Sequence, residues 1–100
     1  MKKVTTKHGT YYLIDLDKGR ALRVRGPYSH EIIRDNVWFA FSSVFAFDRD
    51  AKEPEDRDKG DIQIGHSMYF NLRSFERISW IISSEVVSIE EVEEDVYSGI

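Results

Sequence analysis

Residues 37 to 47 read Val-Trp-Phe-Ala-Phe-Ser-Ser-Val-Phe-Ala-Phe, without a charge, a proline or a glycine. The rest of the chain is much more polar, since 32% of all residues are charged. Aromatic and β-branched side chains favour strands, and strict alternation places all four phenylalanines, Phe39, Phe41, Phe45 and Phe47, on one face. Neither alternate face of this run is polar. We therefore predict one extended strand that is buried on both sides, or buried on one side and covered by a partner on the other. At an open sheet edge such a segment would promote aggregation.

Length and composition are those of one small soluble domain. With 100 residues, 41% of them hydrophobic, the chain can form one core and is too short for two. The absence of cysteine excludes disulfides and thiolate metal sites. The apolar run is shorter than the roughly 18 to 20 residues that a membrane helix needs, and the basic start is followed by polar residues. We expect a single cytoplasmic β domain over residues 1–100.

The first third of the chain predicts a β-hairpin. Residues 10–16 are rich in aromatic and branched side chains, with Thr10, Tyr12, Ile14 and Leu16 on one face. A turn at 17–19 follows, in which Gly19 can adopt a positive φ. In the returning strand, the alternation places Leu22 and Val24 inward and Arg23 and Arg25 outward.

The remaining segments also indicate strands. A second hairpin is expected from 31–34, through Asp35 and Asn36, into the aromatic run. The highly charged segment 48–61 is predicted to be a mobile loop. Further strands are expected around 62–73, 78–82 and 86–89, followed by an acidic C-terminal segment at 90–100. A helix at 85–96 is the main alternative, because glutamate is a good helix former.

These patterns predict an all-β fold with little or no helix. The expected architecture is a small antiparallel meander of six or seven strands that curls into a barrel or roll and so limits its exposed edges. In the strand over 78–82 we expect Ile78, Trp80 and Ile82 to face inward and Ile81 outward. The expected core consists of Tyr12, Ile14, Leu22, Val24, Phe39, Phe41, Phe70, Trp80, Ile82 and Ile89.

Two stretches carry a family resemblance. The segment Gly-Thr-Tyr-Tyr-Leu-Ile-Asp-Leu at 9–16, with Arg-Ala-Leu-Arg at 20–23, resembles the opening hairpin of small uncharacterised β proteins of actinobacteria and their phages. The segment Trp-Ile-Ile-Ser-Ser-Glu-Val-Val-Ser-Ile at 80–89 is similar to their last two strands. Together these stretches cover about a third of the chain. The resemblance implies a small β domain of unassigned activity, encoded by a phage, and it implies no site residues.

No pattern for catalysis or for a bound cofactor is found in the sequence. The acidic loop repeats the Asp-x-Asp spacing of calcium loops, but Lys52 and Glu53 stand where an oxygen ligand and a glycine are needed. His8, His30 and His66 are too far apart in sequence to form a local metal pair. The serines lack an activating context, and the dispersed glycines form no phosphate loop. We expect a non-enzymatic protein without metal or cofactor.

Charge is unevenly distributed along the chain. Residues 1–36 hold 8 basic and 4 acidic groups, for a net +4, whereas the remaining residues hold 6 basic and 14 acidic groups, for a net −8. Basic residues beside aromatic ones are typical of small barrels that bind single-stranded nucleic acid, although solvated strand faces look the same. The overall charge of −4 disfavours the binding of a polyanion such as nucleic acid. The residues for this alternative are Arg20, Arg23, Arg25, Tyr11 and Tyr28.

Protein binding is the function that we predict from the aromatic run. Large aromatic side chains supply the apolar centre of many interfaces, and a two-fold dimer through this strand or its edge would cover it. The alternative is that all of these side chains fill the core of the monomer. We predict a protein-interaction module, as a homodimer or as a phage factor that binds a host protein. The candidate contact residues are Trp38, Phe39, Phe41, Phe45 and Phe47.

Overall fold

The protein folds as a seven-stranded antiparallel sheet, as predicted for an all-β chain. The computed structural model describes residues 1–27, 35–73 and 79–93. Within these ranges the one helical segment is a 3₁₀ turn, η1, at Pro54–Asp56. The strands are β1 Lys2–Thr6, β2 Tyr11–Asp15, β3 Arg20–Val24, β4 Trp38–Phe47, β5 Ser67–Leu72, β6 Trp80–Ile82 and β7 Val86–Glu91.

The strand order is β6-β5-β4-β3-β2-β1-β7, so β1 to β6 form a meander and β7 returns to pair with β1. β1 was not expected as a strand. The acidic end of β7 lies beside the basic start of β1, with Lys2 opposite Glu91 and Lys3 opposite Glu90. The helix considered over 85–96 is therefore wrong for β7. Cross-strand charge pairing and the branched residues at 86, 87 and 89 outweigh the helix propensity of glutamate.

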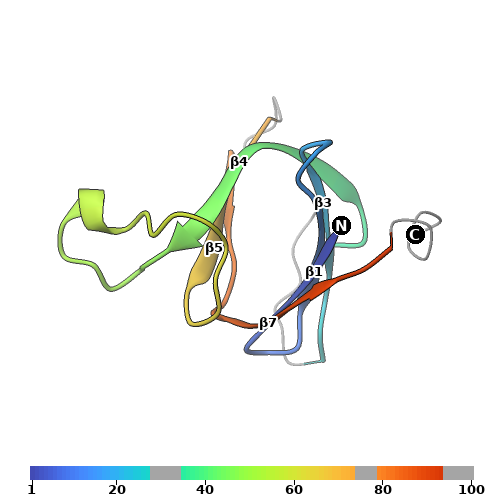
Figure 1. The fold of residues 1–100 in the computed structure, drawn as a ribbon, viewed down its shortest axis with the longest axis horizontal. Coiled ribbons are helices and arrows are strands. Elements are labelled where there is room, and N and C mark those ends of the chain that lie inside the picture. Colours follow the sequence, from blue (N-terminus) through green and yellow to red (C-terminus); the bar gives the residue numbers. More distant parts are fainter. Residues whose placement is uncertain (28–34, 74–78, 94–100) are drawn as a thin grey trace.

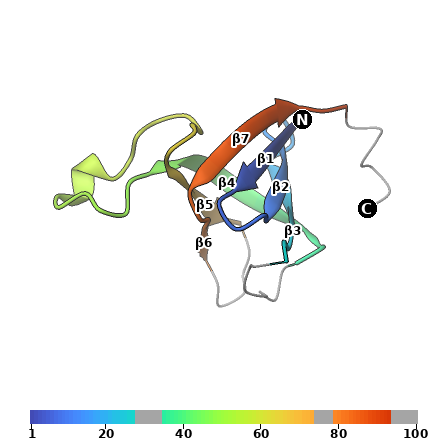
Figure 2. The same cartoon turned by 90° about the horizontal axis from the view of Figure 1, so that it is seen from below.

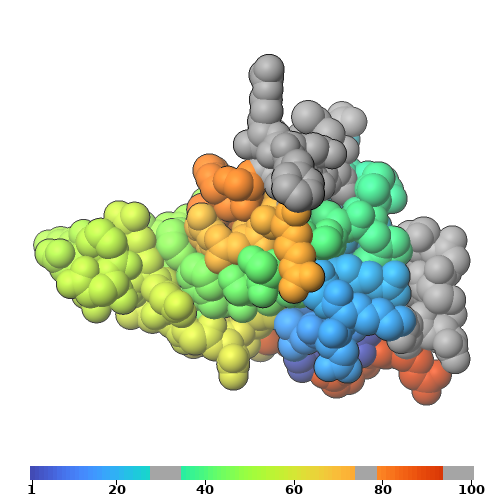
Figure 3. Space-filling model, turned by 90° about the horizontal axis from the view of Figure 1, so that it is seen from above, coloured from blue at the N-terminus to red at the C-terminus, as the bar shows by residue number. Residues whose placement is uncertain are grey.

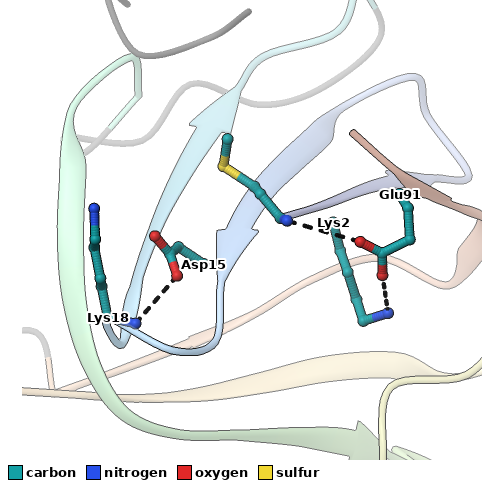
Figure 4. A network of polar contacts seen from close by, with 5 residues as sticks. Lys2, Asp15, Lys18 and Glu91 are labelled. Carbon is teal, nitrogen blue, oxygen red and sulfur yellow. Dashed lines mark hydrogen bonds and ion pairs between the residues drawn. The ribbon is translucent and has the colours of Figure 1, made fainter. Parts of the chain in front are cut away.

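Two contacts of Glu91 join the edge strand β7 to its neighbour β1. Its carboxylate accepts a hydrogen bond of 2.5 Å from Lys2 Nζ, and its other oxygen lies 3.7 Å from the N-terminal amine of Met1. Both contacts are visible in Figure 4. The same view shows Asp15 accepting a hydrogen bond from the main-chain N–H of Lys18, which closes the turn between β2 and β3. The cations lower the pKa of Glu91 through hydrogen bonding and charge attraction.

β4 is the aromatic run, and it joins two parts of the sheet. Its start pairs with β3, where Ala40 lies opposite Arg20, and its later part pairs with β5, where Phe45 lies opposite Tyr69. Figure 1 shows β4 curving across the top of the molecule from the side of β1 and β3 to the side of β5, while β7 runs below. One long strand thus belongs to two walls that face each other.

The core lies between these walls. Phe70 on β5 is fully buried, and its ring centroid is 5.4 Å from that of Tyr12 and 5.5 Å from those of Phe39 and Phe41. β5 and β2 are not neighbours in the sheet, so the contact between Phe70 and Tyr12 requires a strongly curved sheet. The buried cluster is completed by Val4, Ile14, Ala21, Met68, Ile81 and Val86.

A β-bulge in the middle of β4 changes which side chains face the core. The pairing with β5 shifts register between Phe41 and Ser43, so that Ser42 is an extra residue. Before the bulge, Phe39 and Phe41 point inward; after it, Phe45 and Phe47 are only partly buried. The expectation that all four phenylalanines share one face is therefore wrong. One inserted residue reverses the alternation of every side chain that follows it.

The facing of β6 is also the opposite of the prediction. Ile81 is buried in the core, whereas Trp80 is 52% exposed and Ile82 is partly buried. Ile81 is the direct cross-strand partner of the buried Phe70, and directly opposed residues point to the same face of a sheet. Pairing with β5 thus decides the orientation of this short strand.

The first hairpin is confirmed, but the facing of β3 differs from the expectation. Gly19 has a φ of +63°, as the turn requires. Arg23 lies opposite Tyr12 and is buried, so it points toward the core and not outward. Val24 is partly buried, and Leu22 is fully buried but lies outside the main apolar cluster. Leu16 lies beyond β2 and is exposed.

The charged segment 48–61 forms an arm that projects from the end of β4. Main-chain hydrogen bonds tie its returning part to β4, from Ala46 N–H to the Gly60 carbonyl and from Lys59 N–H to the Ala46 carbonyl. Figure 3 shows this arm extending from one side of the molecule. Its predicted mobility stays a prediction.

The second hairpin predicted at 31–36 lies mostly outside the described residues. Asn36 has a φ of +61°, which agrees with a tight turn before β4. No helix among residues 1–27, 35–73 and 79–93 could serve as a membrane-spanning segment.

Candidate interaction surface

Four aromatic side chains form a continuous row on the outer face of β4, β5 and β6. The Tyr69 ring stacks on Phe45, with centroids 5.1 Å apart and planes at 18°. Phe47 lies 5.2 Å from Tyr69 on one side, and Trp80 lies 6.3 Å from it on the other. We call Phe45, Phe47, Tyr69 and Trp80 the aromatic row.

The row is a product of strand register. Phe45 and Tyr69 are direct partners across β4 and β5, and Trp80 on β6 lies opposite Asn71, two residues further along β5. Phe45 and Phe47 reach this face because of the bulge at Ser42. The inner positions between them are taken by Ala46, which is fully buried and lies opposite Met68.

The row is accessible to a partner. Trp80 is 52% exposed, while Phe45, Phe47 and Tyr69 are half-buried because they cover one another. At one end, Asn71 Nδ2 donates a hydrogen bond of 2.7 Å to Ser43 Oγ. At the other end, Phe47 forms an isolated β-bridge with Asp58 of the arm. An apolar centre with polar groups at its margins is the usual composition of a protein interface.

The predicted contact residues divide between the core and the surface. Phe39 and Phe41 are buried in the core and have no surface for a partner. Phe45 and Phe47 are in the row. Trp38 is half-buried on the other wall of the sheet, with the Arg20 guanidinium 4.5 Å from the centre of its ring. Tyr69 and Trp80 were not among the predicted contacts, although alternation along β5 places Tyr69 on the face opposite to the buried Phe70.

The structure separates the residues of the predicted basic patch. Arg25 is exposed. The Lys3 ammonium lies 4.7 Å from the centre of the Tyr11 ring. Arg20 lies over Trp38, with Nε 3.7 Å from an oxygen of the buried Asp15. Arg23 faces the core and is unavailable to a ligand. Tyr28 lies outside the described residues.

Arg23, Asp35 and Tyr12 form a buried polar cluster at the margin of the core. Arg23 donates a hydrogen bond to the carboxylate of Asp35 and also bonds the Tyr12 hydroxyl. Burial disfavours charge on Arg23, but its bonds to Asp35 and Tyr12 outweigh this effect and raise its pKa. Burial raises the pKa of Tyr12, an effect that Arg23 partly offsets. Asp35 directly precedes the turn at Asn36, so this pair fixes the entry into β4.

One polar hollow of about 340 Å³ lies near the turn after β1 and the start of β5. Its lining includes Lys7 and Arg49 together with Asp48, Asp50 and Glu85, so groups of both signs surround it. Arg49 donates a hydrogen bond of 2.8 Å to the Ser83 carbonyl. His8 and His66 also line the hollow, whereas His30 lies outside the described residues. No group of three histidine, aspartate or glutamate side chains suited to a metal ion is found within the described ranges.

Comparisons with protein-family models, with curated proteins and with solved structures find no match to this chain. The candidate surface is therefore characterised by its own geometry.

Proposed function

We propose that the protein is a non-enzymatic interaction module that binds another protein through the aromatic row. The observation that carries this proposal is the stack of Phe45, Tyr69 and Trp80 on an outer sheet face, with Trp80 half exposed. Tyrosine and tryptophan bury a large area at a low cost in side-chain entropy, and they dominate the energetics of many interfaces.

The surrounding structure supports binding by a preformed surface. Three neighbouring strands hold the row, and its rings already contact one another. A partner would therefore meet side chains that lose little freedom on binding. The mixed charges of the hollow beside Arg49 offer no comparable preference for one small ligand.

Three further aspects belong to the same proposal. The curved sheet acts as a small roll, supported by the contact of Phe70 with Tyr12 and by main-chain hydrogen bonds that join Val86 to Gly65 and His66. The working compartment is the cytoplasm, in agreement with the absence of cysteine. The resemblance of 9–16, 20–23 and 80–89 to small proteins of actinobacteria and their phages suggests a phage-encoded factor whose partner is a host protein.

The test is affinity capture from a nuclease-treated lysate with three forms of the protein. A row variant carries Phe45→Ser and Tyr69→Ser, and a control carries Val87→Ser, which changes an apolar side chain that is 48% exposed on β7. A specific partner should be retained by the wild type and by the control, and lost with the row variant. Retention by the folded row variant would contradict the proposal.

Nucleic-acid binding is the second candidate, and the pairs of Lys3 with Tyr11 and of Arg20 with Trp38 favour it. These pairs place cations beside aromatic rings on neighbouring strands, as single-stranded nucleic acid requires. In this candidate Arg23 has no role, because it is buried. Retention on heparin, with release by salt and loss in an Arg20→Ser variant, would support it over protein binding.

A further inference from the structure

We infer that a second copy of this chain binds at the edge of β6 that faces away from β5 and extends the sheet by antiparallel strand pairing about a two-fold axis. This inference rests on the proposed function, because it supplies one partner for the face that carries the aromatic row. It depends on three properties of β6: the direction of its main-chain groups, its lack of charge and its fit to itself.

Hydrogen bonds to β5 identify the groups that β6 directs toward its other side. Leu72 N–H bonds the carbonyl of Ser79, and Ser83 N–H bonds the carbonyl of Met68. In an antiparallel strand, residues that bond one neighbour alternate with residues that face away from it. Trp80 and Ile82 therefore direct their N–H and C=O groups to the outer edge. No described strand other than β5 pairs with β6.

The two edges of the sheet differ in charge. β7 ends with Glu90 and Glu91, both exposed, and acidic side chains at an edge oppose pairing with an identical strand. In contrast, residues 79–84 read Ser-Trp-Ile-Ile-Ser-Ser and contain no charge and no proline. Edge strands are normally protected from pairing by charged residues, by proline or by another segment packed over the edge. Of the two edge strands among the described residues, β6 is thus the one whose own sequence allows pairing with an identical strand.

β6 is complementary to itself. With Ile81 of both copies on the axis, Trp80 of one copy lies opposite Ile82 of the other, and the reverse pair is equivalent. The outward N–H and C=O groups of Trp80 and Ile82 then bond each other in both copies. On the outer face, each indole meets an isoleucine, and aromatic residues pair favourably with β-branched ones. Ser79 and Ser83 meet at the ends of the pairing without a clash of charge.

Such a dimer places the two aromatic rows side by side on one continuous sheet face. Each row ends at Trp80 on the edge strand β6, so the axis lies where the rows approach each other. A single site of limited area is thereby doubled, which increases the apparent affinity for a partner with two contact segments.

The test is sedimentation velocity over a range of protein concentrations. Ile82→Pro removes the outward N–H of Ile82 without removing a bond to β5, whereas Ile82→Val retains it. We expect the wild type and Ile82→Val to form dimers with similar dissociation constants. Ile82→Pro should weaken the dimer at least about tenfold, since hydrogen bonds are lost in both copies.

A second variant guards against misfolding of the proline variant. Ile82→Lys places a charge at the edge, keeps the main chain intact and should also give a monomer. Circular dichroism should show the wild-type spectrum for each variant used. A wild type that stays monomeric at every concentration, or dimers that persist in both variants, would overturn the inference. The capture test with the row variant does not depend on either result, because it tests Phe45 and Tyr69 and not the edge of β6.

Discussion

The ring of Tyr69 stacks on the ring of Phe45 from the directly opposed position on the neighbouring strand, with centroids 5.1 Å apart. This pair faces away from the core because the bulge at Ser42 reverses the alternation of β4. The same strand therefore supplies Phe39 and Phe41 to the core and Phe45 to the surface. In the proposed function, folding and binding use different halves of one aromatic segment.

The two tryptophans should report this arrangement by fluorescence. Trp80 is 52% exposed, whereas Trp38 is half-buried beneath the Arg20 guanidinium. In the Trp80→Phe variant only Trp38 emits. We expect its emission at shorter wavelength, and with weaker quenching by iodide, than the emission of Trp80 in the Trp38→Phe variant. Trp38→Phe should leave the more readily quenched indole. Equal quenching of the two variants would contradict the reversed orientation of β6.

Phe70 and Phe45 should differ strongly in their effect on stability. Phe70 is fully buried against Tyr12, Phe39 and Phe41, so Phe70→Ala should lower the free energy of unfolding by about 3–5 kcal/mol. Phe45→Ala removes the stacking of a half-buried ring on Tyr69 and should lower the free energy of unfolding by roughly 0.5–1.5 kcal/mol. Urea denaturation of both variants measures the difference. Equal losses would mean that Phe45 belongs to the core.

The buried ion pair of Arg23 and Asp35 should show strong coupling. Asp35→Leu leaves a buried guanidinium without its anion and should destabilise the fold by about 3–5 kcal/mol. Replacing both residues by leucine should cost clearly less than the sum of the single changes. A double-mutant cycle in urea measures this coupling. Additive losses would contradict a buried pair that acts as a unit.

Alkaline pH should destabilise the protein through Tyr12. Burial raises the pKa of this phenol above its usual value of 10.0, so the folded state favours the neutral form. The resulting contribution to stability is fully present below pH 10 and decreases as the pH rises through the raised pKa of the folded state. Tyr12→Phe should make unfolding less sensitive to pH in that range. Unchanged sensitivity would remove Tyr12 from this role.

The sequence predicted the strand class well because hydrophobic alternation and turn residues are local signals. Gly19 marks the first hairpin turn, and the run at 37–47 contains the longest strand, Trp38–Phe47. β1 escaped prediction because the acidic residues opposite its two lysines, Glu90 and Glu91, lie on β7, far along the chain. From the sequence alone, a basic segment is interpreted as exposed to solvent when the acidic residues that lie beside it in the fold are distant along the chain.

The candidate surface was predicted only in part, for the same reason. Phe45 and Phe47 were identified by their size, but their facing depends on the bulge at Ser42, which pairing with β5 fixes. Trp80 and Ile81 are adjacent and both apolar, so a three-residue strand does not reveal which one is buried. Alternation with Leu22 and Val24 placed Arg23 outward. A charged side chain seldom lies in a core without a partner, and the partner of Arg23, Asp35, comes from another segment.

Photocrosslinking tests the central claim most directly, namely that the aromatic row contacts a protein. A photoreactive phenylalanine analogue is placed at position 69 in one form and at position 87 in another, since Val87 is also exposed but lies on β7. After irradiation in cells or lysate, we predict strong covalent adducts with protein from position 69 and few from position 87. Absence of adducts at 69, or equal adducts at both positions, would contradict the account.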